Sequence, residues 1–168
     1  MNTHDIPQAN DLDTVRAVVR AVLEGHTHLS TVMEFTRFSK RHCRYRLHAA
    51  RVLGLVTEDD NTFATTPLAA RLLATPLHSL AERSAWLEVV GKSRLMQAMA
   101  PDLLHSRGPS VEELALRLLR LAELSPATAE RRAAGLLAWR RRILDLNSDN
   151  DDHERSVTVE EPTQLDLF

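Results

Sequence analysis

The segment from residue 14 to residue 74 constrains the fold most, because its hydrophobic pattern changes from helical to β-like and back again. Between residues 14 and 23, apolar side chains recur at positions i, i+3, i+4, i+7 and i+8, which places them on one face of a helix. Gly25 ends that pattern. Residues 29–38 predict a second helix with its apolar side chains directed inward.

A third helix and a hairpin follow in the sequence. Ser39 is a suitable N-cap for a helix over residues 40–53, and Gly54 occupies the position where helices commonly end. Two short β-prone runs, residues 55–57 and 62–65, then flank a polar turn sequence. This pattern predicts two strands joined as a hairpin.

A fourth helix completes the first half of the chain. Pro67 opens it, it extends to residue 74, and Pro76 closes it. Three helices, a hairpin and a further helix form the order of a winged helix-turn-helix, which we therefore predict for residues 12–76. Residues 77–146 predict a helical domain, so the expected fold class is mainly α.

The helical domain contains recognisable start and stop signals. Residues 79–100 form one helical pattern that Gly91 interrupts. Residues 110–113 fit a capping box ahead of another helix. Ser125 and Pro126 suit the N-cap and first position of a last helix that ends near residue 145.

The two faces of the third predicted helix differ in chemistry. At about 100° per residue, the core face carries Cys43, Leu47, Ala50 and Leu53. The first turn and the opposite face carry Lys40, Arg41, Arg44, Tyr45, His48 and Arg51. Side chains of these types contact phosphates and guanine edges in a major groove. We therefore predict a DNA-binding surface here, with a solvated basic face as the alternative.

The stretch from Arg44 to Val56 resembles a bacterial winged-helix module. In that group an arginine- and tyrosine-rich recognition helix leads into a Leu-Gly-Leu-Val entry to the wing, here residues 53–56. Such modules often accompany restriction-type nucleases or helicases in defence loci. The resemblance covers roughly residues 12–75, and it implies double-stranded DNA as a ligand and a nuclease or helicase as a partner.

A second candidate surface lies on the last predicted helix. Residues 125–132, with the sequence Ser-Pro-Ala-Thr-Ala-Glu-Arg-Arg, resemble the start of a second recognition helix in the same group of modules. The expected outward stripe of this helix carries Arg131, Gly135, Ala138 and Arg142. Small residues between arginines let a helix approach a phosphate backbone, so Arg131 and Arg142 are further predicted DNA contacts. The alternative is a packing helix with exposed arginines.

Other sequence features favour a binding protein over an enzyme. No Gly-rich phosphate loop, nucleophile elbow or nuclease-type carboxylate–lysine pattern occurs, so we expect no catalytic residues and no cofactor. Cys43 is the only cysteine, and the spacing of the eight histidines matches no closed metal site. Trp86 and Trp139 lie in apolar helical stretches and are expected in the core. The sequence shows neither a signal peptide nor a membrane span, which predicts a cytoplasmic, nucleoid-associated protein.

The charge distribution separates a basic body from an acidic tail. Residues 148–168 contain seven acids and one base, whereas residues 1–147 contain sixteen acids and twenty bases. Residues 147–168 lack helical periodicity and are expected to be disordered up to the last five. Those five, Gln164, Leu165, Asp166, Leu167 and Phe168, resemble at every position the pentapeptide that binds the bacterial sliding clamp. Leu167 and Phe168 are the expected pocket anchors.

Together these features predict a non-enzymatic DNA-binding protein that is recruited to the replication sliding clamp, in replication, repair or defence. Two other functions remain open from the sequence. The protein could be a dimeric transcriptional regulator whose second half forms the dimer interface. It could also be an adaptor subunit of a nuclease or helicase.

Overall fold

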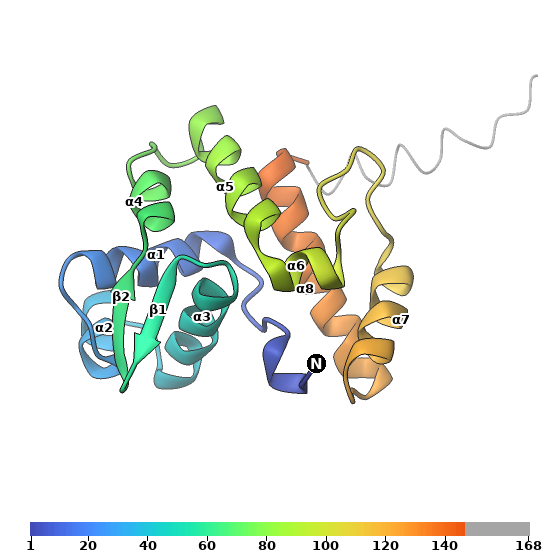
Figure 1. Ribbon diagram of the computed structural model, residues 1–168, viewed down its shortest axis with the longest axis horizontal. Helices are drawn as coiled ribbons and strands as arrows, with labels where there is room; N and C mark the ends of the chain where they lie inside the picture. The colour runs from blue at the N-terminus through green and yellow to red at the C-terminus, as the bar shows by residue number, and fades with distance from the viewer. Residues whose placement is uncertain (147–168) are drawn as a thin grey trace, which may run out of the picture.

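The computed structural model describes residues 1–146 (Figure 1). The predicted acidic tail and the clamp-binding motif lie outside these residues. A short 3-10 turn, η1 (Thr3–Asp5), precedes the other elements. In chain order these are α1 (Leu12–Leu23), α2 (Leu29–Thr36), α3 (Lys40–Val52), β1 (Val56–Asp59), β2 (Thr62–Thr65), α4 (Pro67–Leu73), α5 (Leu80–Lys92), α6 (Arg94–Met99), α7 (Val111–Leu121) and α8 (Pro126–Leu144). The mainly helical fold and the single predicted hairpin are confirmed.

Helices α1, α2 and α3 pack against one another, and the β1–β2 hairpin lies beside α1 and α3. The core face predicted for α3 is buried, and Cys43 and Ala50 are fully inaccessible. The strands pair antiparallel, with Val56 opposite Thr65. This arrangement is compatible with a winged helix.

The ends of α3 follow the predicted signals. The Ser39 side chain accepts a hydrogen bond from the His42 backbone N–H at 3.3 Å, which caps the first turn. Gly54 adopts a left-handed conformation with φ +70°, and the Leu55 N–H donates to the Ala50 carbonyl at 2.9 Å. Because a side chain is strained at this φ, glycine suits the position.

The break in the helical pattern of residues 79–100 falls at Ser93, so the prediction that Gly91 interrupts it was wrong. Gly91 remains within α5. The Ser93 side chain caps α6 and also donates to the Val52 carbonyl at 2.8 Å, which ties the α5–α6 junction to the end of α3. A contact between segments 41 residues apart thus sets the break.

The second half of the chain packs around α8. Ser125 caps α8 and Pro126 opens it, as predicted, and α7 lies beside it. Trp86 and Trp139 are fully buried, which confirms their expected place in the core.

The N-terminal segment, which lies outside both predicted domains, packs between α3 and α8 (Figure 1). Arg132 of α8 donates to the Ile6 carbonyl at 2.6 Å, and the Trp139 indole N–H donates to the Ala9 carbonyl at 2.9 Å. This segment therefore joins the two halves of the molecule. Among residues 1–146 there is no helix with both the length and the apolar character needed to cross a membrane.

Candidate nucleic-acid interface

The N-terminal half of α3 carries a concentration of positive charge. Six lysines and arginines lie between residues 37 and 51, and no acid lies between residues 35 and 57. Lys40, Arg41 and Arg44 are exposed. In the part of the chain that the structure describes, none of these three forms an ion pair with a carboxylate. Their charges are therefore available to an anionic ligand.

Arg41 is oriented by its neighbour on the same face of α3. Its Nε–H donates to the Tyr45 hydroxyl at 2.9 Å, and its guanidinium carbon lies 5.4 Å from the centre of the Tyr45 ring. Tyr45 is half-buried, so it is a fixed support for the arginine. The remaining guanidinium nitrogens can still donate to phosphate or base acceptors.

The C-terminal half of α3 is electrically different. Arg51 forms an ion pair with Glu58 of β1 at 2.7 Å. Burial, and then the adjacent Arg51 charge, lower the pKa of His48. Both residues line a groove that also contains Asp5. Of the six predicted contacts on α3, these two therefore contribute less positive charge than Lys40, Arg41 and Arg44, which have no carboxylate partner within residues 1–146.

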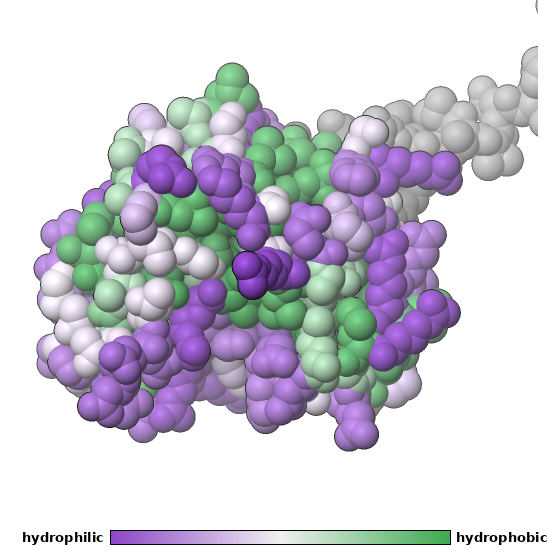
Figure 2. Space-filling view, viewed as in Figure 1, coloured by the Kyte–Doolittle hydropathy of each residue, from purple (hydrophilic) through white to green (hydrophobic). Residues whose placement is uncertain are grey.

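The tip of the hairpin is acidic. Asp59 ends β1, and Asp60 and Asn61 form the turn with φ values of 48° and 59°. Both are residue types that tolerate this left-handed conformation. Because two carboxylates repel phosphates, the tip of the hairpin does not contribute to the basic surface. Hydrophilic side chains gather along the lower edge of the molecule in Figure 2.

The predicted outward stripe of α8 is only partly exposed. Arg131 is exposed, but Arg142 is largely buried, so the expectation that it faces outward was wrong. Its side chain is only 18% exposed and pairs with Asp13 of α1 at 2.9 Å and with Glu82 of α5. Burial opposes its charge, but the hydrogen bonds to Asp13 and Glu82 raise the pKa of Arg142.

Gly135 and Ala138, the small residues of that stripe, do not form an open surface either. A Cβ on Gly135 would lie 3.6 Å from the Cβ of Asn10, and both residues of the stripe are partly buried. The close approach that the small residues permit is made by the N-terminal segment of the same chain. The physical reason for the error is that this segment, which lacks helical periodicity, covers the face.

Sequence reasoning missed Arg132. Its side chain is buried against the N-terminal segment, and burial followed by the Arg131 charge lowers its pKa. The Tyr45 hydroxyl of α3 lies close enough to act on it electrostatically. Helical spacing could have predicted its burial, because residue 132 lies three positions after Ala129 and four before Leu136, which are both buried. Arg132 thus places the start of α8 beside α3.

Buried charges link the two halves at a second point. Glu82 is inaccessible to solvent and forms an ion pair with Arg16 of α1 at 2.5 Å, besides its pair with Arg142. Glu82, Asp13 and His78 are the one group of potential metal ligands within residues 1–146. Guanidinium groups already contact both carboxylates, so the group is explained as an ion-pair network.

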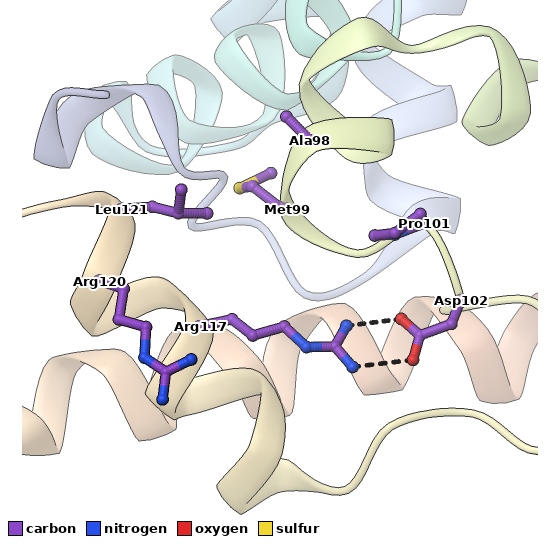
Figure 3. Close-up of a pocket in the computed structure, with 7 residues that line it drawn as sticks. All are labelled: Ala98, Met99, Pro101, Asp102, Arg117, Arg120 and Leu121. Carbon is purple, nitrogen blue, oxygen red and sulfur yellow. Dashed lines mark hydrogen bonds and ion pairs between the residues drawn. The ribbon is translucent and has the colours of Figure 1, made fainter.

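A groove of about 490 Å³ lies between α6 and α7 (Figure 3). Its lining consists of Ala98, Met99, Pro101, Asp102, Arg117, Arg120 and Leu121. Arg117 donates to both carboxylate oxygens of Asp102, at 2.6 and 2.8 Å. These hydrogen bonds lower the pKa of Asp102 and hold α7 against the segment after α6. Arg117 and Asp102 therefore neutralise each other, and Arg120 is a further, exposed cation of the lining.

Comparison with known proteins adds no further assignment, since no protein-family model, curated protein or solved structure matches this chain.

Proposed function

We propose that this protein is a non-enzymatic DNA-binding module with a winged helix-turn-helix, in which α3 is the recognition helix. The observation that carries the proposal lies in the N-terminal half of α3. Its exposed cations Lys40, Arg41 and Arg44 form no ion pair with a carboxylate within residues 1–146. Cations in a first turn oppose the helix dipole, so helix stability does not explain them. A polyanionic ligand would explain why these cations are there.

The start of α8 supports the same surface. Arg132 lies near Tyr45, and the exposed Arg131 is its neighbour in sequence. In Figure 1 the N-terminal ends of α3 and α8 both point to the lower side of the view. An anion bound at either of these helix N-termini is favoured by the helix dipole as well as by the side chains. We propose that Arg131 extends the α3 surface along the phosphate backbone, as one face of a second helix-turn-helix formed by α7 and α8.

Recruitment to the bacterial sliding clamp is the second part of the proposal. It rests on the pentapeptide Gln164 to Phe168 in the sequence. Seventeen residues separate it from Leu146, and a chain of that length spans at most roughly 60 Å. One duplex can therefore hold both the body and a clamp ring that encircles it. Two modest contacts on one DNA raise each other's effective concentration.

The DNA proposal is tested by replacing Arg41 and Arg44 together with alanine. We expect a loss of about 2–4 kcal/mol in binding to duplex DNA. The slope of log K against log salt should become shallower by about 0.9 for each lost phosphate contact. The matched control is the double alanine variant of Arg107 and Arg120, which removes the same charge from exposed positions in the other half. Equal effects in the two variants would refute α3 as the recognition helix.

The clamp proposal is tested by titration calorimetry with purified sliding clamp. The intact chain should bind in the micromolar range, typical of a few buried anchors. Replacing Leu167 and Phe168 with alanine should abolish the heat of binding, because these side chains supply most of the apolar area. The control replaces Val157 and Val159, two apolar residues upstream of the motif. DNA binding should survive both changes. An intact chain that does not bind the clamp refutes this part alone.

A further inference from the structure

The outer face of α5 is apolar although nothing in the described structure covers it. Leu77, just before the helix, is 59% exposed, and Leu80 and Leu87 are 71% and 40% exposed. On the same face of α5, the exposed Ser84 lies between Leu80 and Leu87, and the exposed Gly91 follows Leu87. Figure 2 shows hydrophobic surface at the top of the molecule, where Figure 1 places the start of α5.

The inner face of the same helix is also apolar apart from one charge. Trp86, Val89 and Val90 are buried there, together with the ion-paired Glu82. The apolar face of a helix is normally buried. In α5 a carboxylate is buried while Leu80 is the most exposed large apolar residue of the described chain. This inverted pattern marks the outer face as an interaction surface.

The spacing of the exposed residues specifies its geometry. Positions 80, 84, 87 and 91 of α5 follow one another in steps of four, three and four, which is the a/d spacing of a coiled-coil seam. Large and small side chains alternate along that seam. A Cβ placed on Gly91 would meet nothing within 4 Å, so open space lies above it.

We propose that this seam pairs with the same seam of a second copy of the protein, with the two α5 helices antiparallel. A two-fold axis between positions 84 and 87 sets Leu87 over Ser84 of the partner subunit and Leu80 over Gly91 of the partner subunit. Each leucine then fills the space beside a small residue. A seam that complements itself under two-fold rotation favours a copy of the same chain.

The charges beside the seam also favour a second copy. Arg83 is paired with Asp145 at 2.6 Å, and Glu88 is paired with Lys92 at 2.6 Å and Arg71 at 3.2 Å. Because these charges are already balanced within one chain, two identical rims meet without net repulsion. A strongly acidic segment or a nucleic acid gains little there.

The area of the seam sets the expected strength. Burying a leucine removes about 60–120 Å² of apolar surface from water, so the three exposed leucines together offer about 100–200 Å² per copy. A standard stable interface covers about 800 Å² per partner. The exposed leucines supply only a small part of that area, so we expect weak pairing that is populated only at high protein concentration. In Figure 1 the start of α5 and the N-terminal end of α3 lie on opposite sides, so pairing leaves the DNA surface open.

The test is sedimentation equilibrium of the full chain, without DNA, over a wide range of concentrations. The mean mass should rise from 18.9 kDa towards twice that value. Leu80→Glu combined with Leu87→Glu should abolish the rise. The control Leu116→Glu, at an exposed leucine of α7, should leave it intact. A monomer at all concentrations, or equal loss in the control, overturns the proposal.

Two further variants test the register. Ser84→Leu adds apolar surface but fills the space that Leu87 of the partner subunit needs, so it should weaken pairing at least tenfold. Stronger pairing in this variant overturns the large-over-small register. A mixture of Ser84→Cys and Leu87→Cys chains should form more oxidised dimer than either chain alone, since Cys43 is buried. Equal yields overturn the two-fold axis proposed here. Because DNA and clamp are absent, these outcomes are independent of the proposed function.

Discussion

Glu82 is the residue whose replacement should most weaken the connection between the two halves of the molecule. It is inaccessible to solvent and accepts hydrogen bonds from Arg16 at 2.5 Å, from Arg142, and from the His78 backbone N–H at 2.9 Å. Glu82→Gln keeps the shape of the side chain but removes its charge. The buried Arg16 then lacks a carboxylate partner, and Arg142 retains only Asp13.

The size of the effect follows from what remains. Removing one partner of a buried ion pair costs about 3–5 kcal/mol. Arg16 still donates to the Thr75 carbonyl at 2.8 Å, and glutamine can still accept one hydrogen bond, so the lower end of this range applies. We therefore expect a loss of about 3 kcal/mol in the free energy of unfolding. For a chain of this size that corresponds to a decrease of roughly 6–12 °C in Tm.

The assay is urea denaturation followed by circular dichroism, with the matched control Glu88→Gln. Both glutamates lie on α5 and each has two cationic partners, but Glu88 is exposed at the surface. Exposed pairs contribute little, so the control should unfold close to the wild-type midpoint. If Glu82→Gln is as stable as Glu88→Gln, the buried network does not hold the halves together and this reasoning is refuted.

Three further predictions concern other contacts. Arg117 lowers the pKa of Asp102, so the contribution of this carboxylate to stability is present above its unfolded pKa and is lost as pH falls through its folded pKa. Asp102→Asn should therefore lower the free energy of unfolding by less than about 1 kcal/mol at pH 7 and leave it unchanged at pH 2, as measured by urea denaturation. Gly135→Ala places its Cβ in ordinary contact with Asn10 and improves helix propensity, so it should raise the unfolding free energy by up to about 1 kcal/mol, and a lower value would contradict the packing described. Truncation after Asn147 removes a net charge of −6 and should tighten non-specific DNA binding at low salt. This gain in affinity should vanish as salt is added. An unchanged affinity at low salt would show that the acidic segment does not compete with DNA for the basic face of α3.

Local signals in the sequence predicted most of the secondary structure. Ser39, Ser110 and Ser125 each accept the capping hydrogen bond expected of them, because a cap depends only on neighbouring residues. The core face of α3 was predicted for the same reason, since helical periodicity is local. The break at Ser93 was not, because its hydroxyl is oriented by the distant Val52 carbonyl.

The errors on α8 have a common cause. Periodicity places Arg142 and Gly135 on one stripe, and that geometry is correct. It cannot show that α1 and the N-terminal segment cover the stripe, since Asp13 and Asn10 lie more than 120 residues away in sequence. The charge of an arginine does not resolve its role either. In the sequence, an arginine that pairs with a buried acid is indistinguishable from one that contacts phosphate.

The arginines themselves suggest how the two roles can be separated. Arg41 and Arg44 lie within a stretch of 23 residues, 35–57, that contains no acid, and folding brings no carboxylate into pairing distance of either one within residues 1–146. Arg51 lies in the same stretch, but the hairpin returns Glu58 to it. An arginine available to DNA is therefore one that neither the local sequence nor the fold supplies with a carboxylate. On this criterion the N-terminal half of α3 is the part that we propose to bind DNA, and Arg142 maintains the fold.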